Sequence, residues 1–283
     1  MLNKIFMKNI FKKVTLIIKD VLIILANERL TFANKVNLLF NYIKVRILLF
    51  LDGRIINVKK LRFLGFTVDI VSMNEFFILV QEIFIREVYY FNFNIDNPVI
   101  FDAGSNIGMS VLYFKYLYPN SFIYAFEPSP KTFEILQYNT SENNLKNVEL
   151  FNVGLSDIKS NADFFVKESM SLANTLVVEE RREGEMIEVR VDCLSHYIES
   201  EIDILKLDVQ LSEYKVLHDL DISGKLNFIN TIHMEIHYLP EYKDNEMSSI
   251  LSILEKNNFI YHMELNEIKS DNFATYTLKA FKK

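Results

Sequence analysis

The sequence predicts an α/β fold: a mostly parallel sheet with an antiparallel last strand, helices on both faces, and an N-terminal helical appendage. From Pro98 onward, nearly continuous apolar strands alternate with amphipathic helices, which is typical of a parallel sheet covered on both sides. A glycine-containing turn, residues 104–108, joins the first of these strands to its helix, and Glu127 ends the second strand. With 283 residues, 50% of them hydrophobic, the chain can bury a large core in one or two domains.

The pattern of apolar periodicity and turn residues suggests three parts. These are an N-terminal helical segment at 1–53, a strand-helix lead-in at 54–97 and the main domain at 98–283. In chain order we expect helices at 3–26 and 31–50, short strands at 55–58 and 67–71 around a turn at Gly65, a helix at 75–89, a strand at 99–102, a helix at 106–117, a strand at 122–126, a helix at 130–143, strands at 148–153 and 202–207, a helix at 212–219, a strand at 228–236, a helix at 245–256, and strands near 259–264 and 273–281. The last two strands resemble a hairpin, so the final strand is expected to run antiparallel.

The stretch 157–192 interrupts this alternation. Ala162–Val166 predicts an extra strand, and the charged run 179–185 is typical of a solvated loop. The stretch falls between the third and fourth core strands, over the carboxyl edge of the sheet, where ligands bind in such folds. Residues Ser171–Asn174 are therefore candidates for a lid or a substrate contact.

The first helix has an unusual charge pattern. Lys4, Lys8 and Lys12 recur at helical spacing, and an apolar stretch from Val14 follows. The adjacent Lys19-Asp20 pair argues against a membrane-spanning helix and against a secretory signal. Two interpretations stay open: the segment packs on the main domain or on a second copy of the chain, or residues 1–26 lie on a membrane surface.

Overall composition restricts the partners. The formal net charge of −6 and a pI of about 5.5 argue against nucleic acid as the main partner, because phosphate binding needs a basic face. The single cysteine, Cys193, excludes a disulfide within the chain and favours a reducing, cytoplasmic location, with membrane association as the alternative. We expect Cys193 to be a buried apolar residue at a helix start.

The glycine turn indicates the kind of ligand. A dinucleotide-binding turn carries three glycines, but this chain has Gly104-x-Asn106-x-Gly108 and lacks the middle glycine that makes room for a pyrophosphate. Asp102 precedes the turn, and an acid there suits a cationic ligand better than a polyphosphate. Glu127 is placed to accept hydrogen bonds from the two hydroxyls of a ribose. S-adenosylmethionine, which has a nucleoside, a sulfonium and no phosphate, matches these features.

At these residues the chain resembles the FkbM family of S-adenosylmethionine-dependent methyltransferases. The resemblance covers roughly residues 73–240, and it depends on five segments in the family's order: Val99–Ser110, Tyr124–Ser129, Asn152–Asp157, Ile202–Gln210 and His233–His237. It implies a Rossmann-like class I methyltransferase fold, S-adenosylmethionine as cofactor, and O-methylation of a hydroxyl on a sugar or surface glycan, as in polysaccharide biosynthesis. One departure is Leu211, where the family usually has glycine, and it puts in doubt the turn beside the transferred methyl group.

The cofactor site is expected to be formed by seven residues: Asp102, Gly104, Asn106, Gly108, Glu127, Ser156 and Asp157. Asp102 should face the amino end of the cofactor, through the turn or a water, and Asn106 should offer its amide to the amino-acid moiety. The two glycines permit close approach. Ser156 and Asp157 are placed near the adenine, although Asp157 is equally well explained as a turn acid.

The catalytic residues are expected at the ends of the fourth and fifth core strands. A period of two puts His233, Glu235 and His237 on one face of the fifth strand. His237, nearest the carboxyl end, is the candidate base, with an unperturbed pKa near ~6.5, and Glu235 would orient it or bind the acceptor. Asp208 lies beside the point of methyl delivery. For His233 a buried polar cluster is the competing interpretation. No metal ligand is expected.

Two other functions stay open. A catalytically inactive methyltransferase-like module that acts as a binding partner in glycan assembly would explain Leu211. A nicotinamide-dependent oxidoreductase is disfavoured by the missing middle glycine. A small-molecule or glycan acceptor is the expected partner, and the chain is also a candidate homo-oligomer.

Overall fold

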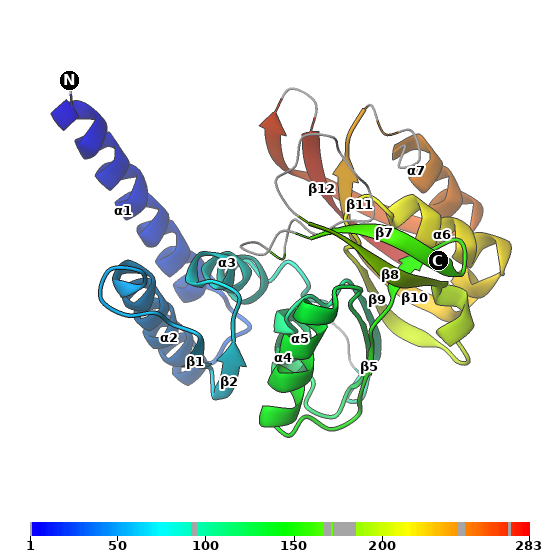
Figure 1. Ribbon diagram of the computed structural model, residues 1–283, viewed down its shortest axis with the longest axis horizontal. Helices are drawn as coiled ribbons and strands as arrows, with labels where there is room; N and C mark the ends of the chain where they lie inside the picture. Colours follow the sequence, from blue (N-terminus) through cyan, green and yellow to red (C-terminus); the bar gives the residue numbers. More distant parts are fainter. Residues whose placement is uncertain are drawn as a thin grey trace. The chain divides into compact units, whose positions relative to one another are not determined.

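The computed structural model describes residues 2–91, 95–166, 171, 185–240, 242, 247–270 and 273–283 (Figure 1). The chain divides into two compact units, an N-terminal unit (residues 1–90) and a C-terminal unit (residues 91–283). Residues 54–90, suggested from sequence to be part of a lead-in, fold with the first two helices in the N-terminal unit.

The N-terminal unit consists of helices and one small hairpin: α1 (Leu2–Ala26), α2 (Phe32–Leu51), β1 (Lys60–Phe63), β2 (Phe66–Asp69), α3 (Met73–Leu79) and a π-helix (Val80–Ile85). The strand expected at 55–58 lies at 60–63 instead. Leu64 and Gly65, with φ of 49° and 93°, form a two-residue turn, so the partner of Phe66 must be the residue directly before the turn, Phe63.

The charge inside the apolar α1 has a structural explanation. Asp20 is 1% exposed and accepts hydrogen bonds from the Tyr42 hydroxyl of α2 at 2.8 Å and from the Gln81 amide at 2.6 Å. A buried carboxylate is tolerated when such donors satisfy it. Asp20 therefore joins α1 to α2 and to the π-helix. Among the described residues, no helix combines the length and the apolar character needed to cross a membrane.

The C-terminal unit contains the expected sheet. Its seven strands follow the order β11-β12-β10-β9-β3-β4-β5. Their bounds are β3 Val99–Ala103, β4 Phe122–Phe126, β5 Val148–Phe151, β9 Ile202–Leu207, β10 Ile229–Tyr238, β11 Phe259–Ser270 and β12 Phe273–Lys282. The pairings from β5 through β10 are parallel, and β12 runs antiparallel to both of its neighbours, which confirms the predicted α/β class and the antiparallel last strand.

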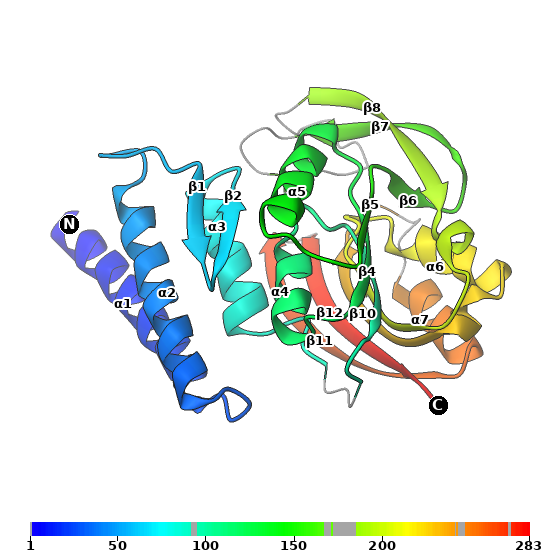
Figure 2. The same cartoon turned by 90° about the horizontal axis from the view of Figure 1, so that it is seen from below.

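Helices cover both faces of this sheet. Figure 2 shows α4 (Met109–Leu117) and α5 (Pro130–Glu142) on one face and α6 (Glu213–Ile222) and α7 (Met247–Lys256) on the other. The core between the sheet and α6–α7 is mainly apolar, with residues such as Leu205, Leu217 and Ile250 at 0% exposure. Burial of each such side chain stabilises the fold by roughly 1.5–3 kcal/mol. The sheet therefore supports the loops at its carboxyl edge in a fixed position.

A second sheet, of three strands, is inserted between β5 and β9 along the chain. It has the order β6-β8-β7, with β6 at Gly154–Ser156, β7 at Ser160–Val166 and β8 at Glu185–Cys193. β7 includes the extra strand expected at 162–166. A short 3₁₀ helix, Leu194–Tyr197, follows Cys193, which is buried as expected. Residues 172–174 of the expected lid and most of the charged run at 179–185 lie outside the described residues.

Candidate active site

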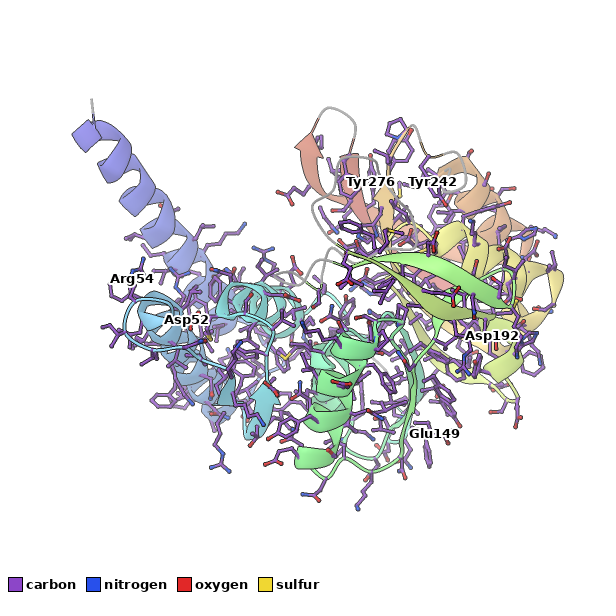
Figure 3. The ribbon with its side chains drawn as sticks, viewed as in Figure 1. Asp52, Arg54, Glu149, Asp192, Tyr242 and Tyr276 are labelled. Atoms are coloured by element: carbon purple, nitrogen blue, oxygen red, sulfur yellow. The ribbon has the colours of Figure 1, made fainter. Side chains whose placement is uncertain are left out.

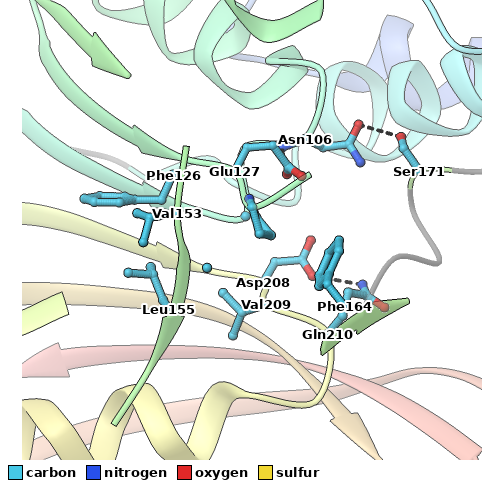
Figure 4. A pocket seen from close by; sticks show the side chains of 13 residues that line it. Asn106, Phe126, Glu127, Val153, Leu155, Phe164, Ser171, Asp208, Val209 and Gln210 are labelled. Atoms are coloured by element: carbon cyan, nitrogen blue, oxygen red, sulfur yellow. Dashed lines mark hydrogen bonds between the residues drawn. The ribbon is translucent and has the colours of Figure 1, made fainter. Parts of the chain in front are cut away.

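A pocket lies where β3, β4 and β9 end, and the loops after these strands form its floor (Figure 4). It encloses about 580 Å³ of empty space, a volume that includes space open to solvent. Two acids, Glu127 and Asp208, line it together with apolar side chains from β4, β6 and β7. Figure 4 shows both carboxylates turned toward the space between them.

The glycine turn after β3 is shaped by its protein neighbours. Gly104 has φ of 81°, and a Cβ there would lie 1.8 Å from the backbone oxygen of Asp208. Gly108 has φ of 90°, and its Cβ would lie 2.7 Å from a methyl group of Leu136 in α5. Both positions therefore need glycine for conformation and for packing. Gly104 also lines the pocket, whereas Gly108 does not line it.

Glu127 organises the turn and lines the pocket at the same time. Its carboxylate accepts hydrogen bonds from the backbone N–H groups of Asn106, at 3.1 Å, and Ser129, at 2.9 Å. Burial raises the pKa of Glu127 to about 7, and the two backbone donors only partly oppose this. Each carboxylate oxygen has more than one acceptor site, so Glu127 can accept further hydrogen bonds from a ligand in the pocket.

Asn106 and Ser171 meet at the rim of the pocket. The side-chain oxygen of Asn106 accepts hydrogen bonds from its neighbour Ile107 N–H at 2.6 Å and from the Ser171 hydroxyl at 3.0 Å, as Figure 4 shows for Ser171. Both residues line the pocket. The Asn106 NH₂ group is the part of this side chain that can donate to a ligand carboxylate.

Asp102 does not line the pocket but lies beneath the turn. It is 0% exposed, accepts a hydrogen bond from the Ser110 hydroxyl at 2.5 Å, and pairs with Lys206 of β9 at 3.1 Å. The Lys206 ammonium also donates to the backbone oxygen of Gly104 at 2.6 Å. Burial alone would lower the pKa of Lys206, but Asp102 and Asp208 outweigh it and raise that pKa. Asp102 therefore acts on the turn through Lys206.

Ser156 and Asp157 were expected near the adenine, but the residues just before them line the pocket instead. Ser156 donates to the Asp157 carboxylate at 3.2 Å, and Asp157 lies 4.0 Å from a ring nitrogen of His218. Neither Ser156 nor Asp157 lines the pocket. The lining instead includes Val153, Gly154 and Leu155 just before them, and Phe164 of β7. An apolar wall suits a flat aromatic base.

The loop after β9 brings Asp208 and Gln210 to the pocket. The Gln210 amide donates to the Asp208 carboxylate at 3.2 Å, and both residues are among those that line the pocket (Figure 4). The sequence predicts Asp208 at this position but gives no signal for Gln210. A glutamine two residues after an acid at a strand end carries little information by itself, because the position that its side chain reaches depends on the conformation of the turn.

His237 and Glu235 lie on β10, next to this loop but outside the pocket lining. His237 Nδ1 is 3.0 Å from the buried carboxylate of Glu213 in α6, and Nε2 is 2.9 Å from the Gln210 amide nitrogen. Burial alone would lower the pKa of His237, but Glu213, Glu235 and Asp208 outweigh it and raise that pKa to about 9. The pKa near ~6.5 expected for an unperturbed ring therefore does not apply.

His233, on the same face of β10, is a buried histidine. It is 1% exposed and packs edge-on against Phe91, with ring centroids 5.5 Å apart. Burial, with Lys279 and Lys206, lowers its pKa well below the usual value, so the ring is neutral. This agrees with the interpretation of His233 as part of the core.

Comparison with known proteins gives the family. Residues 102–261 match the model of the methyltransferase FkbM domain, which is more than half of the chain and contains most of the pocket described above. The chain belongs to this family. The methyltransferase character predicted from the motifs is thereby confirmed, and S-adenosylmethionine is the cofactor that this assignment supports.

Individual relatives agree with the family. The chain is 32% identical to Methyltransferase 1 of Beauveria bassiana over 163 residues, which cover 50% of this chain and 66% of that protein. It is 30% identical to Methyltransferase sdnD of Sordaria araneosa over 184 residues, which cover 53% and 71%. A solved structure, M. jannaschii TYW2 in complex with AdoMet, is similar with a TM-score of 0.43 and 14% identity, covering 78% of this chain and 84% of that one. At that level it does not bear on the activity of this FkbM domain.

The FkbM domain keeps the tight turn after β9 although the expected glycine is replaced. Leu211 has φ of 77° and Gln210 has φ of 51°, so two consecutive residues adopt the left-handed conformation that glycine takes without strain. The Leu211 side chain is 2% exposed, and its N–H donates to the Glu213 carboxylate at 3.2 Å. Burial and this hydrogen bond offset the backbone strain, and the turn persists.

Proposed function

We propose that this FkbM-domain protein transfers a methyl group from S-adenosylmethionine to a hydroxyl group of a sugar or surface glycan. The proposal depends above all on Glu127, a buried acid at the end of β4 that lines the pocket together with Asp208. Family membership supports the methyl transfer, and the hydroxyl acceptor is the finer part that is proposed.

The pocket residues fit the cofactor in type and position. Glu127 would accept hydrogen bonds from the ribose hydroxyls, Leu155 and Phe164 would enclose the adenine, and Asn106 would bind the amino-acid end. Asp208 supplies a negative charge that favours a sulfonium nearby. When bound, S-adenosylmethionine supplies an electrophilic methyl group.

On the acceptor side, Asp208 and Gln210 are the polar side chains in the pocket, and Glu235 and His237 lie behind them. During transfer, the acceptor oxygen forms a bond to the methyl carbon as the carbon–sulfur bond breaks, and the hydroxyl proton leaves to a base. Holding the oxygen in line accounts for much of the barrier reduction. His237 stays the predicted base in the absence of a bound cation; with a pKa of about 9 it holds a proton near neutrality, so transfer should speed up as the pH rises toward 9, and Gln210 connects it to the pocket.

Binding and transfer can be tested separately. Isothermal titration of the full chain with S-adenosylmethionine should show one site, and titration with a nicotinamide dinucleotide should show none. Transfer of isotope-labelled methyl to a panel of sugars and glycan fragments should then yield methyl ethers. Labelling of amines but not of hydroxyls would contradict the proposed acceptor. Cofactor binding without any transfer would favour an inactive binding module.

A further inference from the structure

Three potential ligand side chains converge beside the pocket, at the carboxyl ends of β9 and β10. Asp208, Glu235 and His237 each present a donor atom, and these atoms all lie within 4.8 Å of one another. The sheet explains the cluster, because Met234 pairs with Leu207 in the parallel β9–β10 register, so Glu235 lies opposite Asp208 one residue further on. Three residues that are distant in sequence thus share one edge of the sheet.

We propose that Asp208, Glu235 and His237 bind a divalent metal cation on the acceptor side of the pocket. The proposal rests on the proposed function, because it assigns the cation to the hydroxyl acceptor. Two carboxylate oxygens and one imidazole nitrogen suit Mn²⁺, and three protein ligands leave positions open for substrate or water. The sequence alone predicted no metal ligand, since these residues come from two segments.

The surroundings of His237 have the arrangement found around metal-binding histidines. Its Nδ1 lies 3.0 Å from the Glu213 carboxylate, and Glu213 is 0% exposed. A carboxylate on one ring nitrogen fixes the orientation of the ring and directs the other nitrogen toward a metal. Here the other nitrogen is Nε2, which faces the loop that carries Asp208 and Gln210.

The position of Gln210 marks where the donors meet. Its amide nitrogen lies 2.9 Å from His237 Nε2 and 3.2 Å from the Asp208 carboxylate oxygen. One small polar group thus bridges two of the three proposed ligands. A cation at this point would displace the amide group or take its oxygen as a further ligand.

The carboxylates of the cluster also outnumber its cations, and a metal at Nε2 would replace the proton that the raised pKa of His237 keeps on the ring. Glu213 adds a third carboxylate to those of Asp208 and Glu235. Lys206 approaches Asp208 to 3.9 Å but pairs more closely with Asp102, at 3.1 Å. A bound divalent cation would offset this negative charge, and it would bind the acceptor oxygen and make its hydroxyl more acidic.

Another group with metal-type donors is a weaker candidate. Asp192, labelled in Figure 3, lies with Cys193 and His196 on β8 and the following 3₁₀ helix. Its carboxylate is already engaged by His196 at 2.7 Å, Lys159 at 3.2 Å and the Cys193 N–H at 2.9 Å. Burial raises the pKa of the Cys193 thiol to about 11, which disfavours the thiolate that a metal requires.

The metal site can be tested without the reaction. Mn²⁺ binding to the full chain is measured by loss of the free-ion electron paramagnetic resonance signal, with S-adenosylmethionine present and absent. One Mn²⁺ per chain is expected, with affinity reduced by at least about 10-fold in Glu235→Gln and in Asp208→Asn, and by a similar factor in Glu213→Gln. Glu149→Gln, at an exposed acid of β5, is the matched control and should bind Mn²⁺ normally.

The outcomes distinguish this inference from the proposed function. Failure of the folded wild-type chain to bind Mn²⁺, or equal loss in the Glu149→Gln control, would overturn the metal site. Hydroxyl methylation that persists at full rate after chelation would overturn it too, and would leave the proposed function standing. Mn²⁺ binding that depends on Glu235 and Asp208, without methylation of any hydroxyl, would support the site and contradict the proposed acceptor.

Discussion

A single buried acid, Glu127, holds the turn after β3 and also lines the pocket. It receives the N–H groups of Asn106 and Ser129 on one side and faces the pocket on the other. Because one side chain serves both purposes, replacing Glu127 should weaken ligand binding more than replacing an exposed residue that makes one hydrogen bond.

Glu127→Ala should weaken S-adenosylmethionine binding by ~1.5–3 kcal/mol, the range for hydrogen bonds that involve a charged group. Isothermal titration of the variant and wild type gives the difference directly. Circular dichroism must show that the variant is folded. Unchanged affinity in a folded variant would refute the ribose assignment.

The pKa of about 7 for Glu127 predicts a pH dependence near neutrality. Below pH 7 the carboxyl is protonated and accepts hydrogen bonds from a ribose less well, so cofactor affinity should rise as pH increases from 6 to 8. The raised pKa also affects stability, because the folded protein binds a proton at Glu127 more tightly than the unfolded chain does. The stabilisation that this proton gives is therefore complete in acid and is lost as the pH rises through about 7. Glu127→Gln should remove the binding dependence, and a slope that persists in the variant would assign it to another group.

Replacement of Leu211 by glycine compares two contributions to the free energy of unfolding: the strain of its left-handed backbone and the burial of its side chain. Replacement by glycine would relieve about 1–2 kcal/mol of left-handed strain, but it would remove a leucine side chain whose loss from a core costs about 2–5 kcal/mol. Leu211→Gly is therefore expected to lower the free energy of unfolding by roughly 1–3 kcal/mol in a urea titration. A more stable variant would show that the side chain contributes little.

At the scale of the elements, β10 carries Glu235 and the proposed base, His237. His237→Ala should reduce turnover by ~10²–10⁴-fold, the usual contribution of a positioned acid–base group. Cofactor affinity should change little, because His237 lies behind Gln210 and not in the pocket lining. Single-turnover rates and titrations on the same preparation separate these effects. Loss of both together would assign His237 a structural role at the sheet edge.

The sequence predicts the strands and helices of the large sheet well, because apolar strands between helices leave few alternatives. It misses β8, where exposed residues such as Glu188 and Arg190 alternate with buried Val189 and Val191. A strand with this many charged residues gains its stability from its partners, here β6 and β7, and those partners cannot be predicted from the local sequence pattern.

In the candidate site too, the sequence predicts the residues that depend on local pattern and misses those that depend on tertiary partners. Glycines and acids at strand ends, such as Gly104, Glu127 and Asp208, could be placed from topology alone, and all three line the pocket. Phe164 and Gln210 could not, because they reach the pocket through the second sheet and through an unusual turn. Asp102 was placed beside the cofactor, but its interactions are with Lys206 and Ser110, a pairing that depends on strand order.

At the scale of the whole molecule, charge differs between the two units. Residues 1–90 contain 14 Lys and Arg against 7 Asp and Glu, whereas the remaining residues contain 17 and 30. In addition, α2 exposes Phe32, Phe40 and Phe50, each more than 60% exposed, and these recur at helical spacing. A basic unit with an exposed apolar helix face is suited to anionic lipid, which extends the expectation for residues 1–26.

Full-length protein should therefore sediment with vesicles that contain anionic phosphatidylserine, and binding should weaken as salt rises. Residues 91–283 alone should stay in the supernatant and still bind S-adenosylmethionine, because every described residue of the pocket lies in that unit. Phe40→Asp should reduce vesicle binding without affecting cofactor affinity. Concentration-dependent dimers without vesicle binding would instead assign the α2 face to a second copy of the chain.

Lys206 lies where it can couple the binding of the cofactor to the binding of the acceptor. Its ammonium contacts Asp102 and the Gly104 carbonyl on the proposed cofactor side, and it approaches Asp208 on the proposed acceptor side. A ligand that displaces either group by a few tenths of an ångström alters the contacts of the other through one buried charge. Cofactor and acceptor should consequently bind with a coupling free energy different from zero, and each should change the affinity of the other by the same factor.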